Sequence, residues 1–174
     1  MKKVIPLIIL ILISSLIKAQ ENKDTWTDAE KNYYEVLRVF CQYLKSNTEY
    51  FRDLVLERFV EFDYVLKDTS VTRIKRRKIQ LDTLVLQFEK YIDLIGLENL
   101  DAKPLRLYSP IHKIRLPFNG ELGDVSNEVF AYYRKGSEDY PLGTIWFNKK
   151  NSKLISWILI NQGGYYYFLT FNLL

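Results

Sequence analysis

Apolar side chains in the first half of the chain recur at steps of three and four residues. This spacing places them on one face of a helix and predicts three helices in succession. The first follows Thr27, the second covers about residues 48–66 and the third about 71–95. Thr27 and Glu30 have the spacing of a capping box, and Gly96 is a residue type that ends helices. An alternative is that the first two helices are continuous.

From Leu105 onward the pattern changes to short apolar runs separated by Gly, Pro, Asn and Asp. Such runs predict strands bounded by turns. We expect strands near residues 105–109, 111–118, 128–135, 142–148, 153–161 and 165–172. Helices followed by strands indicate an α+β domain, in which two or three N-terminal helices pack on one face of a mostly antiparallel β-meander of four to six strands.

The last two predicted strands are joined by Gly163 and Gly164, which favour a two-residue turn. In that register Ile160 lies opposite Tyr167. One hairpin face then carries Ile158, Ile160, Tyr167, Leu169 and Phe171, and the other carries Ile155, Trp157, Leu159, Tyr166 and Phe168. Because a half-exposed antiparallel sheet alternates apolar with polar residues, either both faces are covered or one is an apolar surface. The sequence leaves open which sheet face the helices do not cover.

The N-terminal residues fit neither pattern. Lys2 and Lys3 precede an apolar stretch over residues 4–17, and Ala19 follows, which is the order of a secretory signal. The stretch is shorter than the ~20 residues that span a bilayer. We therefore expect a signal peptide over residues 1–19, a linker over 20–26 and one domain over 27–174, helical to residue 100 and β from 101. Cleavage is favoured over a retained anchor, and the expected location is periplasmic or extracellular.

Charge and cysteine content narrow the function classes. Without the three leader lysines, 22 basic residues face 21 acidic ones, so the net charge is +1. No nucleic-acid-binding motif is recognised, and a nucleic-acid partner is not expected. Membrane contact is expected only through the signal segment before cleavage. Cys41, the one cysteine, forms no internal disulfide, and its spacing to Leu37 and Leu44 predicts burial on a helix face.

The strongest run of charge lies at the start of the third predicted helix. It comprises Arg73, Lys75, Arg76, Arg77 and Lys78. Positive charge opposes the helix dipole at this end, so helix stability does not explain the run. A solvated helix face is the simpler interpretation. The alternatives are a surface for an acidic partner protein and a surface for phosphate, in anionic lipid or nucleic acid.

The sequence gives little support for a catalytic site or a metal site. His112 is the only histidine and a candidate for acid–base catalysis, but no G-x-S-x-G turn supplies a nucleophile for it. Asp53, Glu57 and Glu61 recur every four residues and could also serve as an acid–base pair, although a polar helix face is the simpler interpretation. The few Cys and His residues do not have the spacing of a zinc site, and phosphate-loop glycines are missing. We therefore expect no metal and no cofactor, and we lean against an enzyme.

Tyrosine and tryptophan concentrate in the predicted strands. These side chains combine apolar area with a polar group and are typical of recognition surfaces. Core packing is the simpler explanation for any one of them, and their collective excess favours a binding surface on the sheet. We select as ligand- or partner-binding residues Tyr132, Trp146, Trp157, Tyr166 and Phe168.

Together these patterns favour an exported binding module without enzymatic activity. Its aromatic sheet face, or a cleft between sheet and helices, would hold a small apolar ligand, a glycan or a partner protein. The order of helices before a curved meander resembles NTF2-like and cystatin-like folds, which implies a cone-shaped or wrapped sheet and rests on element order alone. Two alternatives stay open: an NTF2-like small enzyme with His112 in a pocket, and an inhibitor or envelope structural protein that uses the basic run.

Overall fold

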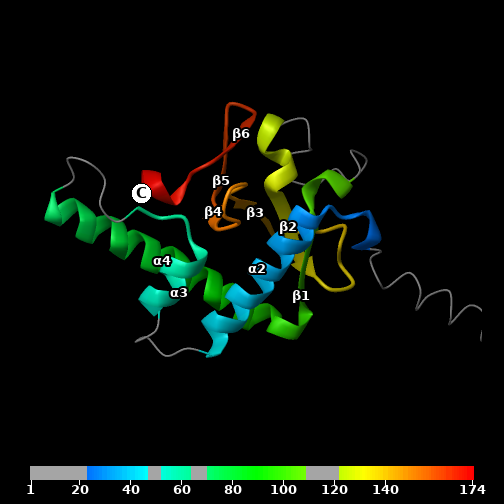
Figure 1. The fold of residues 1–174 in the computed structure, drawn as a ribbon, viewed down its shortest axis with the longest axis horizontal. Helices are drawn as coiled ribbons and strands as arrows, with labels where there is room; N and C mark the ends of the chain where they lie inside the picture. Colours follow the sequence, from blue (N-terminus) through cyan, green and yellow to red (C-terminus); the bar gives the residue numbers. More distant parts are fainter. Residues whose placement is uncertain (1–22, 47–51, 64–69, 109–121) are drawn as a thin grey trace, which may run out of the picture.

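Three helices precede six strands in the computed structural model, which describes residues 23–46, 52–63, 70–108 and 122–174 (Figure 1). The helices are α2 (Asp28–Ser46), α3 (Arg52–Phe59) and α4 (Val71–Ile95). The strands are β1 (Leu100–Pro104), β2 (Val129–Arg134), β3 (Gly143–Phe147), β4 (Leu154–Ser156), β5 (Leu159–Gln162) and β6 (Tyr165–Phe168). The predicted α+β class is confirmed. No helix within these ranges is long and apolar enough to span a membrane.

Strands β1 to β4 form an antiparallel meander in sequence order, and β5 and β6 form a separate hairpin. Gly163 and Gly164 both have positive φ and form its turn, so Ile160 pairs with Tyr167 as predicted. Helices α2, α3 and α4 gather against one face of the meander (Figure 1). There the sheet contributes Ala102, Phe130, Tyr132, Ile145, Phe147 and Leu154.

The start of α2 is fixed by the predicted capping box. The Thr27 N–H donates to Glu30 Oε2 at 2.7 Å, and the Glu30 N–H donates to Thr27 Oγ1 at 3.2 Å. Arg106 also donates to both Glu30 oxygens, at 2.6 and 2.7 Å, and so ties α2 to the turn η4 (Leu105–Leu107). Burial alone would raise the pKa of Glu30, but its bonds from Arg106 and Thr27 outweigh burial and lower it.

The second predicted helix is wrong in length, because α3 ends at Phe59. The next residue, Val60, forms a parallel bridge with Leu154 of β4, and the Glu61 N–H donates to the Leu154 carbonyl at 2.8 Å. Pairing with the sheet edge therefore replaces the helix. The first strand also differs: it spans Leu100–Pro104, and the residues after it form η4. The strand expected over 111–118 lies outside the described residues.

The long strand predicted over residues 153–161 is divided between β4 and β5. Ser156 explains the break: its Oγ accepts from the Ile158 N–H at 2.9 Å and donates to the Leu169 carbonyl at 2.6 Å. Such side-chain bonds compete with the strand ladder. The chain consequently leaves the meander after Ser156. Trp157 and Phe168 were expected on the same hairpin face, but Trp157 packs in the cluster that the helices cover and Phe168 in the cluster that the hairpin covers.

The β5–β6 hairpin covers the sheet face that the helices leave. Phe168 and Leu159 pack there against Val129, Ala131 and Trp146. Five of the six residues of β2 are buried as a result. Both faces of the meander are therefore covered. On the hairpin, for which the sequence predicted two apolar faces, Phe168 is buried against the meander, whereas Tyr167 is 41% exposed and Ile160 is half-buried.

Candidate functional site

The five selected aromatic residues do not share an exposed surface. Trp157 stacks on Phe88 of α4 with ring centroids 5.0 Å apart, and Tyr132 is buried in the same helix-covered cluster. Trp146 contacts Phe168 on the opposite sheet face, with centroids 5.6 Å apart. Tyr166 is half-buried in the hairpin. Four of the five therefore pack in the two clusters, and no common binding face results.

A pocket of about 380 Å³ lies between α2 and β1, at the type of sheet–helix cleft that the sequence suggested. We call it the α2–β1 pocket. Helix α2, the turn η3 (Leu97–Asn99), β1 and the residue after β2, Lys135, form its walls. Its lining comprises Tyr34, Leu37, Arg38, Cys41, Gln42, Leu97, Glu98, Leu100, Asp101, Ala102 and Lys135.

The floor of this pocket is apolar. Leu37, Cys41 and Ala102 all line it and are all buried. Burial raises the pKa of the Cys41 thiol to about 12, because an apolar environment disfavours the thiolate. At neutral pH Cys41 is therefore a protonated, weakly polar floor residue and not a nucleophile.

Tyr34 forms one wall and is held from several directions. Its hydroxyl donates to Asp101 Oδ1 at 2.9 Å, and the same oxygen accepts from the Ala102 N–H at 2.9 Å. The Lys23 Nζ lies 3.4 Å from the centre of its ring, and Trp26 meets that ring edge-on at 5.4 Å. Burial and the neighbouring Asp101 charge raise the pKa of Tyr34 well above its usual range, so the hydroxyl stays a donor.

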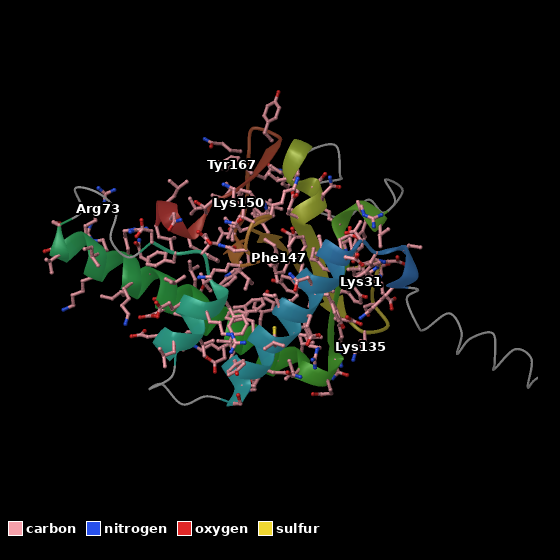
Figure 2. The ribbon with its side chains drawn as sticks, viewed as in Figure 1. Lys31, Arg73, Lys135, Phe147, Lys150 and Tyr167 are labelled. Carbon is pink, nitrogen blue, oxygen red and sulfur yellow. The ribbon has the colours of Figure 1, made fainter. Side chains whose placement is uncertain are left out.

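The opposite wall is a fixed corner between α4 and β1. Gly96 takes φ of +83°, and a Cβ there would collide with the Glu98 carboxylate, so this turn requires glycine. Asn99 Nδ2 donates to the Ile95 carbonyl and to Glu98 Oε1, both at 3.0 Å. Lys135, labelled in Figure 2, donates through Nζ to the Glu98 carbonyl at 2.6 Å. These bonds give the pocket mouth a defined shape before any ligand arrives.

Charges at the rim are largely paired within the protein. The Arg38 guanidinium donates to both oxygens of Glu35, at 2.6 and 3.0 Å. Asp101 uses Oδ1 for Tyr34 and Ala102, whereas no described residue donates to its Oδ2. The rim therefore offers a ligand Asp101 Oδ2 as an acceptor beside an apolar floor.

The basic run divides into three parts. Arg77 is buried and donates to the carbonyl oxygens of Asp63, Asn172 and Leu174, so it does not belong to an exposed basic surface. Lys78 pairs with Asp53 at 2.8 Å. Arg73, Lys75 and Arg76 are exposed. His112 lies outside the described residues.

Sequence patterns missed most of the α2–β1 pocket. Tyr34 could have been found, because it precedes Leu37 and Cys41 at helical spacing and so borders their face of α2. Asp101 and Lys135 are distant in the sequence and carry no motif. Among the described residues no group of three or more His, Cys, Asp and Glu side chains is placed to hold a metal ion.

Comparisons of the chain with protein-family models, curated proteins and solved structures find no match. The resemblance to NTF2-like and cystatin-like folds therefore rests on the order of elements alone. Function has to be argued from the pocket itself.

Proposed function

We propose that this protein is an exported binding protein that holds a small, largely apolar ligand in the α2–β1 pocket. The observation that carries the proposal is a preformed concavity with a buried apolar floor and a rim of fixed polar groups. Small-molecule sites commonly combine these two features, and about 380 Å³ lies within their usual range. The leader-like order of residues 1–19 supports export.

The expected ligand has an apolar body and one hydrogen-bond donor. Its body would displace water from Leu37, Cys41 and Ala102, at roughly 25 cal/mol for each Å² of apolar surface buried. Its donor would meet Asp101 Oδ2 at the rim. Since Tyr34 and the Gly96 corner are already held by internal bonds, little ordering would be needed on binding.

The test uses N-phenyl-1-naphthylamine, a neutral apolar dye whose fluorescence rises on leaving water. We expect saturable binding and, at saturating dye, slower backbone hydrogen exchange in the segments that line the pocket, residues 34–42 and 97–102, with no change in the β5–β6 hairpin. Dye binding that leaves exchange in the lining segments unchanged would place the dye elsewhere and contradict the proposal.

Two leucines three residues apart provide matched variants. Leu97 lines the pocket, whereas Leu94 is 86% exposed on the last turn of α4 and does not line it. Leu97→Glu places a charge beside the apolar floor and should weaken dye binding about tenfold or more, because burying that charge is unfavourable. Leu94→Glu should leave binding unchanged. Equal loss in both variants, with melting temperatures unchanged, would rule out the α2–β1 pocket as the dye site.

A further inference from the structure

A second pocket lies between the first turns of α4 and the C-terminal turn η7 (Phe171–Leu173). Its volume is about 450 Å³. Helix α4 lines it with Arg73, Arg76 and Gln80, and Leu173 and Leu174 line it from η7. We call it the α4–η7 pocket. It shares no lining residue with the α2–β1 pocket, and Figure 2 shows Arg73 at the far end of α4.

Two arginines of this pocket carry charges that no described residue pairs. Arg73 and Arg76 are exposed, and neither forms an ion pair with any other described residue. The first turn of α4 contains no acidic residue. At this end the helix dipole is positive, so both charges oppose it. Their position therefore disfavours α4, and a bound anion would relieve the repulsion.

Arg77 forms the buried part of the same pocket. Its Nη1, Nη2 and Nε donate to the carbonyl oxygens of Asp63, Asn172 and Leu174 at 2.6, 3.2 and 3.1 Å. The bonds to Asn172 and Leu174 hold η7 and the residue after it against α4, and the bond to Asp63 holds the segment after α3. The pocket is therefore built without a ligand, and its exposed positive charge comes from Arg73 and Arg76.

We propose that the α4–η7 pocket binds a phosphate group, carried by an anionic phospholipid or by a soluble phosphate ester. The planar fork of an arginine matches the oxygens of a phosphate and can donate two hydrogen bonds at once. Leu173 is 71% exposed in the pocket wall, and Val71, beside the lining residue Thr72, is 83% exposed. These side chains provide apolar surface next to the arginines for the organic part of the ligand. The site is independent of the function proposed for the α2–β1 pocket.

The experiment has one arm for each source of phosphate. Vesicles of phosphatidylcholine with and without phosphatidylglycerol test the lipid by co-sedimentation, and glycerol 3-phosphate tests the soluble ester by calorimetric titration. We expect binding in at least one arm, and the arm that binds identifies the source. Arg73→Gln combined with Arg76→Gln should weaken this binding about 25-fold, because each arginine near an anionic surface contributes roughly fivefold. Absence of binding in both arms overturns the proposal.

A charge-matched control separates a site from diffuse attraction. Lys149→Gln with Lys150→Gln removes the same charge from the exposed β3–β4 turn, which lies away from Arg73 in Figure 2. This pair should leave binding nearly unchanged. Equal weakening by the two double variants would show that only net charge matters and would overturn the proposal. Neither arginine pairs with a described residue, so the thermal stability of the arginine variant should be unchanged or higher.

Discussion

The meander face that meets the helices packs large rings against large rings. Phe147 stacks on Tyr33 of α2 with centroids 4.9 Å apart. The opposite face has fewer buried rings: Val129 and Ala131 lie beneath Phe168 of the hairpin, whose ring contacts the half-buried Trp146. One sheet therefore has an interlocked aromatic core on one side and a small cluster under a short hairpin on the other.

This difference indicates that the two covers have unequal stability. The helix-covered cluster draws side chains from α2, α3, α4 and four strands. The hairpin has two strands of four residues, and an isolated two-stranded hairpin is marginally stable. It depends on the contacts of Leu159 and Phe168 with the sheet. We therefore expect the hairpin to open locally at a lower free energy than the helix-covered core.

The largest effect should come from Phe147→Ala. Phe147 is fully buried and contacts both Tyr33 and Phe130, so the substitution leaves a cavity that rigid neighbours cannot fill. We expect the free energy of unfolding, measured in urea, to fall by about 4 kcal/mol. Tyr140→Ala, at an aromatic residue that is 75% exposed, is the control and should change it by less than about 0.5 kcal/mol. A loss below about 1 kcal/mol for Phe147→Ala would refute the idea of an interlocked core.

Phe168→Ala makes the same chemical change on the other face. Its ring contacts Trp146, and the hairpin can relax around the missing ring, so we expect a smaller loss of about 2 kcal/mol. Hydrogen exchange should speed up in β5 and β6 more than in α2. Tyr165→Ala, at the exposed neighbouring tyrosine, serves as the control and should leave exchange unchanged. Equal acceleration throughout α2 and the hairpin would mean that the two faces open as one unit.

Sequence patterns predicted the features that depend on residues close together in the chain. The Thr27–Glu30 capping box, the end of α4 at Gly96 and the pairing of Ile160 with Tyr167 are all as expected. Each depends on residues within one turn of helix or one hairpin. The fold class followed because helical spacing precedes strand-like runs along the chain.

Features that depend on distant partners could not be predicted in the same way. Arg77 was placed in a surface run, yet it is buried, because carbonyl oxygens as far away as Leu174 accept its hydrogen bonds. The break after Ser156 depends on the Leu169 carbonyl. The wall of the α2–β1 pocket joins Tyr34 to Asp101 across 67 positions. No periodicity in a single sequence records such pairings.

The smallest predicted effect is electrostatic and belongs to the helix-covered face alone. Cys41 and Tyr132 both lie in that cluster, and burial raises the pKa of each to about 12. In the unfolded chain a thiol titrates near pH 9, so only the unfolded state loses this proton between pH 9 and 12. Stability must therefore fall as pH rises through this window. The tyrosine adds to the loss above about pH 10.

Between pH 8 and 10, Cys41 should account for a loss of about 1 kcal/mol in the free energy of unfolding. Cys41→Ala lowers stability at every pH by removing a buried side chain, but it should abolish this pH-dependent part. Urea titrations of both proteins at pH 8 and 10 measure the difference. Parallel decreases in the two proteins would show that the thiol titrates normally and is not sealed by the helices. Because Cys41 also lines the α2–β1 pocket, a ligand that excludes water from the floor should leave the onset of the loss near pH 9 and extend the loss to higher pH, since it raises the pKa of the thiol in the folded state only.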